Sequence, residues 1–200
     1  MTRRELLVLL GVSPLYASGL GDGPCATAVS AITIASKDEP GPRMAVSGQV
    51  FLPDGKTPAV GVIMFAWHTD AKGLYSDDGS VFHPRLRGWM KTDGQGRYEY
   101  RTIRPAPYPG HTNPAHVHVQ FWGPGIATQF AQELNFSDDA LIKPEDRRRS
   151  AELGRFAFVR PAELRNGVLY VTADYRLHGE APFGNALFGV EPCHVKITVP

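Results

Sequence analysis

The chain has 200 residues, which is enough for one domain with a substantial hydrophobic core. Its 21 glycines and 17 prolines are too many for a helical bundle and are typical of a chain with many turns and short strands. A formal net charge of +1 gives no electrostatic reason to expect a nucleic-acid partner. The charged cluster at residues 145–149 mixes both signs, so it predicts a solvated helix face and not a nucleic-acid patch.

Residues 1–28 carry the pattern of an export signal. Arg3 and Arg4 precede an apolar run from Leu6 to Leu10, and small residues follow, which resembles a twin-arginine signal. The pattern predicts a periplasmic or extracellular protein. A short N-terminal helix or tail on a cytoplasmic protein is the alternative. No later stretch is long and apolar enough to span a membrane, so the mature protein is not expected to contact one.

The chain has two cysteines, Cys25 and Cys193. In an oxidising compartment they can form a disulfide that ties the N-terminal segment to the last strand. Signal cleavage at residues 26–28 would remove Cys25, whereas cleavage nearer Ala17 or Gly19 would keep it. Two unrelated thiols are an equal alternative.

The expected elements follow in chain order. Residues 29–43 predict an irregular N-terminal arm, and residues 44–200 predict one domain. The stretch 68–96 has little strand pattern, so we expect a long functional loop there. Strands are expected at Met44–Leu52, Val60–His68, Arg97–Ile103, Ala115–Trp122, Ile126–Phe136, Gly167–Leu177 and His194–Val199, and a helix at Pro144–Leu153. This pattern predicts an all-β fold: a single-domain β-sandwich of mostly antiparallel strands, with long active-site loops and one short helix.

Two histidines stand one residue apart on a predicted strand. His116 and His118 would project from one face, because side chains two residues apart on a strand point the same way. Two imidazoles form half of a metal site, although strand histidines without a metal are more common for this pattern alone. No cysteine lies nearby, which argues against a thiolate zinc site. Asp77, Asp78 and Glu133 leave a two-histidine, one-carboxylate site open.

Two tyrosines lie close to this pair in the sequence. Tyr108 stands between Pro107 and Pro109, which restrict the backbone and fix the direction of the ring. Tyr75 lies in the long loop. A tyrosine between prolines most often serves packing alone.

Three segments together resemble the intradiol ring-cleavage dioxygenases, a family that includes protocatechuate 3,4-dioxygenase. They are GVIMFAWHTDAKGLY, TDGQGRYEYRTIRPAPYP and NPAHVHVQFWGPGIATQF, and the similarity spans about residues 45–142 in order and with comparable spacing. In that family a mononuclear non-haem Fe(III) ion is held by two tyrosines and two histidines. The resemblance assigns these four roles to Tyr75, Tyr108, His116 and His118.

The resemblance also implies an activity. The family uses O2 to open a catechol-type aromatic diol between its two hydroxylated carbons, giving a muconate-type diacid. Phenolate is a hard anionic donor, and a highly charged ion can remove a phenol proton whose pKa in water is about 10. By the resemblance, Tyr75 would leave its position when the substrate binds and take up a proton, while Tyr108 would stay. The sequence leaves open whether identical subunits assemble into an oligomer.

Two positions depart from the family pattern. Asn113 stands where the family has an arginine that helps to stabilise negative charge on the substrate. Glu133 stands where the family has a glutamine, and Gln132 beside it becomes the match if the alignment shifts by one residue. A strand would point Gln132 and Glu133 in opposite directions. With Tyr75, Asn113 and Glu133 are the catalytic candidates.

Four further residues are candidates for the substrate pocket, each with a more ordinary alternative. Core packing is the more common role for a residue such as Trp67, a surface ion pair for Arg104 and an exposed loop position for His111. The fourth candidate is Gln132. Two other functions stay open: an exported metal-binding β-sandwich with little or no dioxygenase activity, and a ferric enzyme that acts on a non-catechol phenol.

Overall fold

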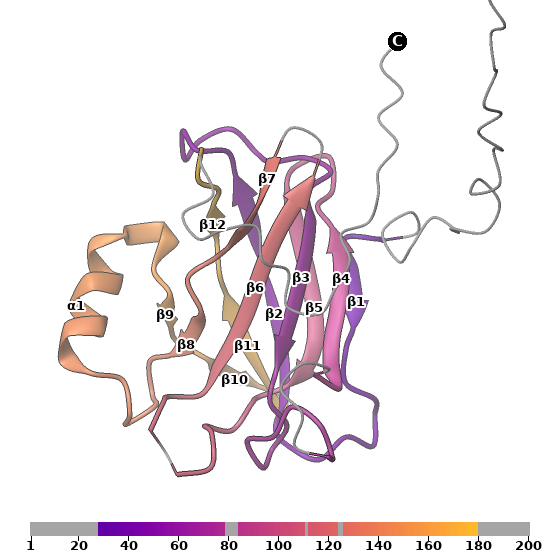
Figure 1. The fold of residues 1–200 in the computed structure, drawn as a ribbon, viewed down its shortest axis with the longest axis vertical. Helices are drawn as coiled ribbons and strands as arrows, with labels where there is room; N and C mark the ends of the chain where they lie inside the picture. Colours follow the sequence, from indigo (N-terminus) through magenta and orange to yellow (C-terminus); the bar gives the residue numbers. More distant parts are fainter. Residues whose placement is uncertain (1–27, 79–83, 111, 124–125, 180–200) are drawn as a thin grey trace, which may run out of the picture.

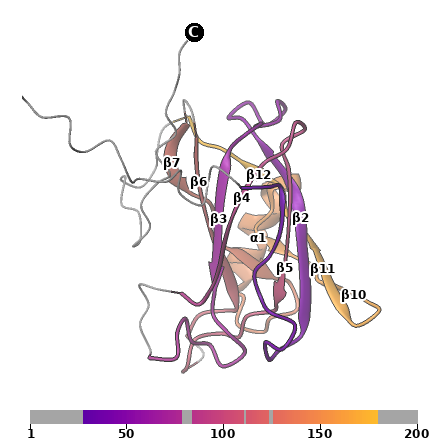
Figure 2. The same cartoon turned by 90° about the vertical axis from the view of Figure 1, so that its right-hand side faces the viewer.

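The computed structural model describes residues 28–78, 84–110, 112–123 and 126–179. These residues form two sheets that pack face to face, as the two layers in Figure 2 show. The first sheet has the order β1 (Ala31–Thr33), β5 (Arg97–Ile103), β2 (Arg43–Phe51), β11 (Val168–Thr172) and β10 (Glu163–Arg165), and β12 (Tyr175–Arg176) also pairs with β2. The second has the order β4 (Leu86–Lys91), β3 (Ile63–His68), β6 (His116–Gly123), β8 (Leu134–Phe136) and β9 (Val159–Arg160), and β7 (Ile126–Phe130) also pairs with β6.

The predicted all-β sandwich is confirmed. Most pairings are antiparallel, and the parallel ones are β1–β5, β2–β11, β2–β12 and β8–β9. The predicted helix is α1 (Pro144–Glu152), beside β9 in Figure 1, and a short 3₁₀ turn, η1 (Gly154–Phe156), follows it. Pro144 opens the helix and Gly154 follows it with a φ of 57°, as helix boundary rules predict. In the described part of the chain, no helix has the length and apolarity that a membrane span requires.

Several predicted boundaries were wrong. The stretch 68–96 contains strand β4, and the predicted irregular arm contains strand β1. Strand β4 was not predicted because Gly88 interrupts the alternation of apolar and polar residues that indicates a strand. The structure needs glycine there, since a Cβ would lie 2.4 Å from Cδ1 of Ile32 on β1. The strand predicted at Ile126–Phe136 is two strands, β7 and β8, with residues 131–133 between them.

The other strand predictions also need adjustment. The run predicted at Val60–His68 begins at Ile63, and Gly167–Leu177 splits into β11 and β12 around residues 173–174. Strands β9 and β10 were not predicted. The predicted strand His194–Val199, the signal segment before residue 28 and both cysteines lie outside the described residues.

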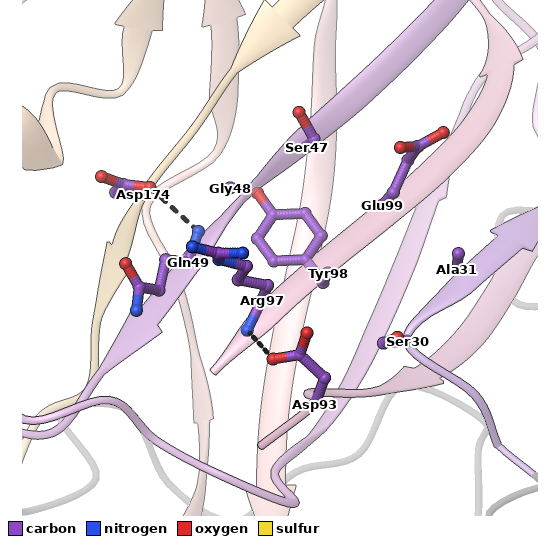
Figure 3. A pocket seen from close by; sticks show the side chains of 10 residues that line it. All are labelled: Ser30, Ala31, Ser47, Gly48, Gln49, Asp93, Arg97, Tyr98, Glu99 and Asp174. Carbon is purple, nitrogen blue, oxygen red and sulfur yellow. Dashed lines mark hydrogen bonds between the residues drawn. The ribbon is translucent and has the colours of Figure 1, made fainter. Parts of the chain in front are cut away.

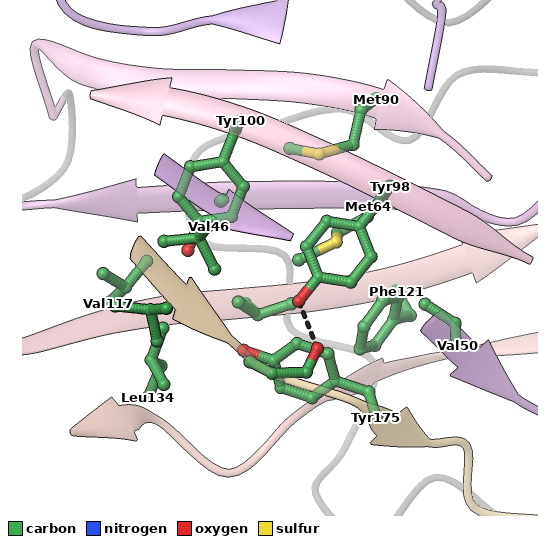
Figure 4. Close-up of a cluster of buried hydrophobic side chains, with 14 of the residues drawn as sticks. Val46, Val50, Met64, Met90, Tyr98, Tyr100, Val117, Phe121, Leu134 and Tyr175 are labelled. Carbon is green, nitrogen blue, oxygen red and sulfur yellow. Dashed lines mark hydrogen bonds between the residues drawn. The ribbon is translucent and has the colours of Figure 1, made fainter. Parts of the chain in front are cut away.

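The main core lies between the two sheets (Figure 4). Val46, Val50, Tyr98 and Tyr100 come from the first sheet, and Met64, Met90, Val117 and Phe121 from the second. Alternation along β6 therefore turns its valines into the core and its histidines to the opposite face of the second sheet.

The outer face of the second sheet carries an aromatic cluster of its own. Every residue of β3 is buried, because alternate side chains face the main core and this outer cluster. The outer cluster contains Ile63, Phe65, Trp67, Tyr75 and Trp122, with Tyr108, Trp89 and Phe130 packed against it. The histidines and tyrosines therefore lie on the outer face of the second sheet and not inside the sandwich.

Candidate metal centre

The two histidines lie side by side at the start of β6. His116 is 5% exposed, and the side chain of His118 is 20% exposed. Their Nε2 atoms are 3.1 Å apart, and Nδ1 of His116 lies 2.7 Å from the carbonyl oxygen of Pro114. That carbonyl can only accept a hydrogen bond, so His116 carries its proton on Nδ1 and presents a lone pair at Nε2.

Trp67 supports His118 from the neighbouring strand. The two residues are directly opposite each other in the β3–β6 register, and their rings stack at 4.9 Å with an interplanar angle of 17°. Trp67 is 6% exposed and belongs to the outer aromatic cluster. Its contacts are those of a packing residue that fixes the plane of the His118 ring.

A close contact between two loops brings the tyrosines together. The turn at residues 70–74 packs against the proline segment that precedes Tyr108, at the lower end of the sandwich in Figure 1. The amide of Ala106 donates to the carbonyl of Asp70 at 3.0 Å. Gly73 has a φ of 82°, and a Cβ there would lie 2.1 Å from the carbonyl oxygen of Pro107. Only glycine permits this approach, which places Tyr75 beside Tyr108.

A network of charges anchors the other side of the Tyr75 loop. The backbone amide of Arg85 donates to the carbonyl of Tyr75 at 2.7 Å. The guanidinium of Arg85 forms two hydrogen bonds, of 2.5 and 3.0 Å, with the carboxylate of Glu39, and one of its nitrogens lies 3.5 Å from Oδ2 of Asp70. Asp70 also accepts the amide of Leu74 at 3.0 Å through Oδ1. The loop that carries Tyr75 is thus held at both ends.

Four side-chain donor atoms converge at this point. The Oη atom of Tyr75 lies 2.5 Å from Oη of Tyr108 and 2.6 Å from Nε2 of His118. The Oη atom of Tyr108 lies 3.0 Å from Nε2 of His116 and 3.5 Å from Nε2 of His118. The structure therefore brings together all four residues that the sequence resemblance assigns as metal ligands.

The chemistry of these donors fits a highly charged metal ion. Burial is the main cause that raises the pKa of Tyr75 and of Tyr108, so both phenols are neutral in the protein without a metal. Burial also lowers the pKa of His116, which leaves its imidazole neutral and ready to donate its lone pair. Two phenols in such a place become anionic ligands only when a strong cation replaces their protons.

Glu133 contacts the far side of His118. Its Oε1 atom lies 3.2 Å from Nδ1 of His118, and this hydrogen bond is the main cause that lowers the pKa of Glu133. The carboxylate lies close enough to both histidines to form a two-histidine, one-carboxylate group. Because it engages Nδ1, however, Glu133 leaves Nε2 of His118 directed at the tyrosines and fixes the required tautomer. The set of two tyrosines and two histidines explains why both Oη atoms and both Nε2 atoms converge, which the two-histidine, one-carboxylate group does not explain.

The remaining candidates do not join the four donors through any described contact. Arg104 forms two hydrogen bonds with Asp138, of 2.6 and 2.8 Å, and covers the ring of Phe136, which is the surface pairing weighed as its alternative. Asn113 and Gln132 are exposed. His111 lies outside the described residues. Of the neighbours Gln132 and Glu133, Glu133 is the one that contacts His118, from the segment between β7 and β8.

A separate hollow lies on the first sheet, far from this chemistry (Figure 3). It has a volume of about 470 Å³, and its lining includes Asp93, Arg97 and Asp174. Its acidic groups already have partners: Asp93 accepts the backbone amide of Arg97, and Asp174 accepts that of Gln49. We assign no function to it.

Known proteins resemble this chain in sequence and in fold. The family model described as "Dioxygenase" matches residues 12–169. Catechol 1,2-dioxygenase 1 of Acinetobacter lwoffii is 35% identical over 64% of this chain and 46% of that enzyme. The protocatechuate 3,4-dioxygenase beta chain of Burkholderia cepacia is 29% identical over 51% of this chain and 48% of that protein. The chain thus spans about half the length of the curated relatives that it matches.

Solved structures agree with these relatives. The dioxygenase domain of a dioxygenase and carbohydrate-binding fusion protein from Streptomyces sp. SirexAA-E is 25% identical, with a TM-score of 0.57, over 74% of this chain and 88% of that one. The intradiol ring-cleavage dioxygenase of Tetranychus urticae, at 19% identity, shares the fold with a TM-score of 0.58 over 80% of this chain and 92% of that one. The family match over most of the sequence and the shared sandwich lead to one conclusion: the chain belongs to the intradiol dioxygenase family.

Proposed function

We propose that this protein opens catechol-type rings between their two hydroxylated carbons, using O2 and a resident ferric ion. The observation that carries the proposal is the convergence of Tyr75, Tyr108, His116 and His118, whose donor atoms lie 2.5 to 3.5 Å apart. Family membership implies non-haem iron, and two phenol ligands favour the ferric state, because hard anionic oxygens stabilise the higher charge. Relatives named for catechol, chlorocatechol and protocatechuate cleavage support the reaction type.

The ferric ion, when bound, supplies a Lewis-acidic centre that can take both catechol oxygens and polarise the ring. In the overall reaction the carbon–carbon bond between the hydroxylated carbons breaks, and both atoms of O2 enter the diacid. The atoms and electrons balance without an external reductant. The protein's own contribution is to hold the donors in place, to receive the substrate protons and to keep the chosen tautomers.

The two tyrosines have different parts in this proposal. Tyr108 is restrained by its flanking prolines and stays in place throughout. By the family resemblance, Tyr75 is the ligand that yields to the substrate, by rotation of its side chain on an anchored loop, and holds a substrate proton at Oη. Its raised pKa, which burial causes, suits it to keep that proton.

The test uses the full chain produced in iron-rich medium. We expect a red to burgundy protein that contains iron, because tyrosinate-to-ferric charge transfer absorbs visible light. We also expect oxygen uptake on addition of catechol, protocatechuate or hydroxyquinol. A colourless, iron-free protein without oxygen uptake would contradict the proposal. A coloured protein that is inactive on all three compounds would favour a ferric enzyme for a non-catechol phenol.

Export through a twin-arginine signal remains our proposal for the location, supported by the Arg3-Arg4 pair before an apolar run. Such transport carries folded protein, so iron could enter before export. Mass spectrometry of the N-terminus would decide: an intact N-terminus on cytoplasmic protein would remove this proposal.

A further inference from the structure

We infer that Glu133 makes this site selective for neutral catechols, that is, vicinal ring diols without an acidic substituent. The inference rests on the proposed function and names the substrate class of the same site. Glu133 acts here as a specificity-determining residue, in addition to its contact with His118.

The position of Glu133 places a negative charge beside the donor atoms. It lies in the short segment between β7 and β8, and its carboxylate oxygen is 3.2 Å from Nδ1 of His118. A carboxylate oxygen of Glu133 and one ring nitrogen each of His116 and His118 all lie within 4.8 Å of one another. The Glu133 side chain is 45% exposed, so the charge is only partly covered by protein. A substrate that binds at the four donors therefore approaches this charge.

No lysine or arginine among the described residues pairs with Glu133. The hydrogen-bond partner of Glu133 is an imidazole, and the guanidiniums of Arg85 and Arg104 already pair with Glu39 and Asp138.

The consequence for a ring substituent follows from electrostatics. A carboxylate on the catechol ring would face the charge of Glu133 without a cationic partner, whereas a neutral ring pays no such cost. The two charges are the carboxylate of Glu133 and that of the substrate, separated by about one substrate length. At a dielectric constant between that of a protein surface and that of water, their repulsion weakens binding on the order of fivefold. Added salt weakens the effect because it screens partly exposed charges.

The experiment compares catechol with 3,4-dihydroxybenzoate in the iron-loaded protein. Spectral titration without oxygen gives each Kd, and oxygen uptake gives each kcat/KM. We expect the wild type to favour catechol. Glu133→Gln keeps the length of the side chain and an oxygen that accepts from His118, but removes the charge. It should lower the ratio of the Kd of 3,4-dihydroxybenzoate to the Kd of catechol on the order of fivefold. Glu99→Gln, on β5 in the other sheet, is the matched control and should leave the ratio unchanged.

The outcomes separate this inference from the proposed function. Equal binding of both diols by the wild type, or a ratio that Glu133→Gln does not change, would overturn the inference and leave the dioxygenase assignment intact. If Glu133→Gln does not retain iron, the two Kd values of the wild type are measured at increasing salt concentration. A ratio of these Kd values that is independent of ionic strength would overturn the inference. Iron-loaded wild type that responds to neither diol would contradict the proposed function itself.

Discussion

At the scale of single residues, the four donors do not depend equally on their surroundings. Both histidines lie on β6, where the strand alternation alone turns them to one face. Their tautomers are set by separate acceptors, the carbonyl of Pro114 for His116 and the carboxylate of Glu133 for His118. Tyr108 reaches both imidazoles, at 3.0 and 3.5 Å, so it is the donor that joins the two histidines.

Replacing Tyr108 by phenylalanine should therefore remove most of the bound iron. The variant loses a phenolate oxygen, and the carboxylate of Glu133 does not take its place while it contacts Nδ1 of His118. We expect iron content to fall at least tenfold, with loss of the visible absorption, measured by elemental analysis and spectroscopy of purified protein. The control is Tyr170→Phe, which makes the same chemical change at a partly exposed position on β11 and should retain iron. Full iron occupancy in Tyr108→Phe would rule out this tyrosine as a ligand.

At the scale of elements, the contact between two loops decides where the tyrosines meet. The turn at residues 70–74 and the proline segment before Tyr108 come from different sheets, since one follows β3 and the other follows β5. Gly73 is the point of closest approach, with Pro107 directly opposite. Asp70, Arg85 and Glu39 fasten the same turn from the other side.

A methyl group at Gly73 should separate these loops. Gly73→Ala places a Cβ 2.1 Å from the carbonyl oxygen of Pro107, at a φ of 82° that itself costs about 1–2 kcal/mol for alanine. We expect reduced iron retention and a shifted visible band in the iron that remains. Gly167→Ala is the matched control, because that glycine has a φ of 78° and open space around it. It should lose a similar stability but keep its iron and spectrum. Equal spectra for both variants would refute a role for the loop contact.

At the scale of the whole molecule, His68 connects the two sheets beneath the site. It ends β3, and its Nε2 lies 2.7 Å from the hydroxyl of Thr102 on β5, in the opposite sheet. Its Nδ1 lies 2.7 Å from the carbonyl of Thr69, so Nδ1 donates and Nε2 accepts. Burial lowers the pKa of His68 to about 4. The folded protein therefore holds this imidazole neutral at every pH near neutrality.

This buried histidine should make folding stability fall in mild acid. Between pH 6.5 and about 4 the unfolded chain binds a proton at His68 that the folded protein excludes, so the free energy of unfolding decreases as the pH is lowered through that range. The full effect of His68 is about 3 kcal/mol. Urea unfolding at pH 7.5 and pH 4.5 should show a smaller acid loss in His68→Gln than in the wild type. The comparison cancels the contribution of other groups such as His116. Identical losses in both proteins would show that His68 is not the source.

The local features of this molecule were predictable from the sequence, because short-range rules govern them. Alternation placed His116 and His118 on one face, and proline and glycine marked the ends of α1. The family resemblance named all four donors. The mixed charges at residues 145–149 were correctly expected on a helix, where Arg149 pairs with Asp146 at 3.0 Å.

Only the tertiary structure decided how these parts meet. Strand β4 was missed because the reason for its Gly88 is a close contact with Ile32, more than fifty residues earlier in the chain. The choice of Glu133 over Gln132 depends on where β7 ends and β8 begins, and the pairing of Arg104 depends on Asp138. Gly73, Arg85 and Glu39 had no local signal at all, since each acts on a segment distant in sequence. Local chemistry sets which side chains can bind a metal, but long-range packing sets which of them share one point in space.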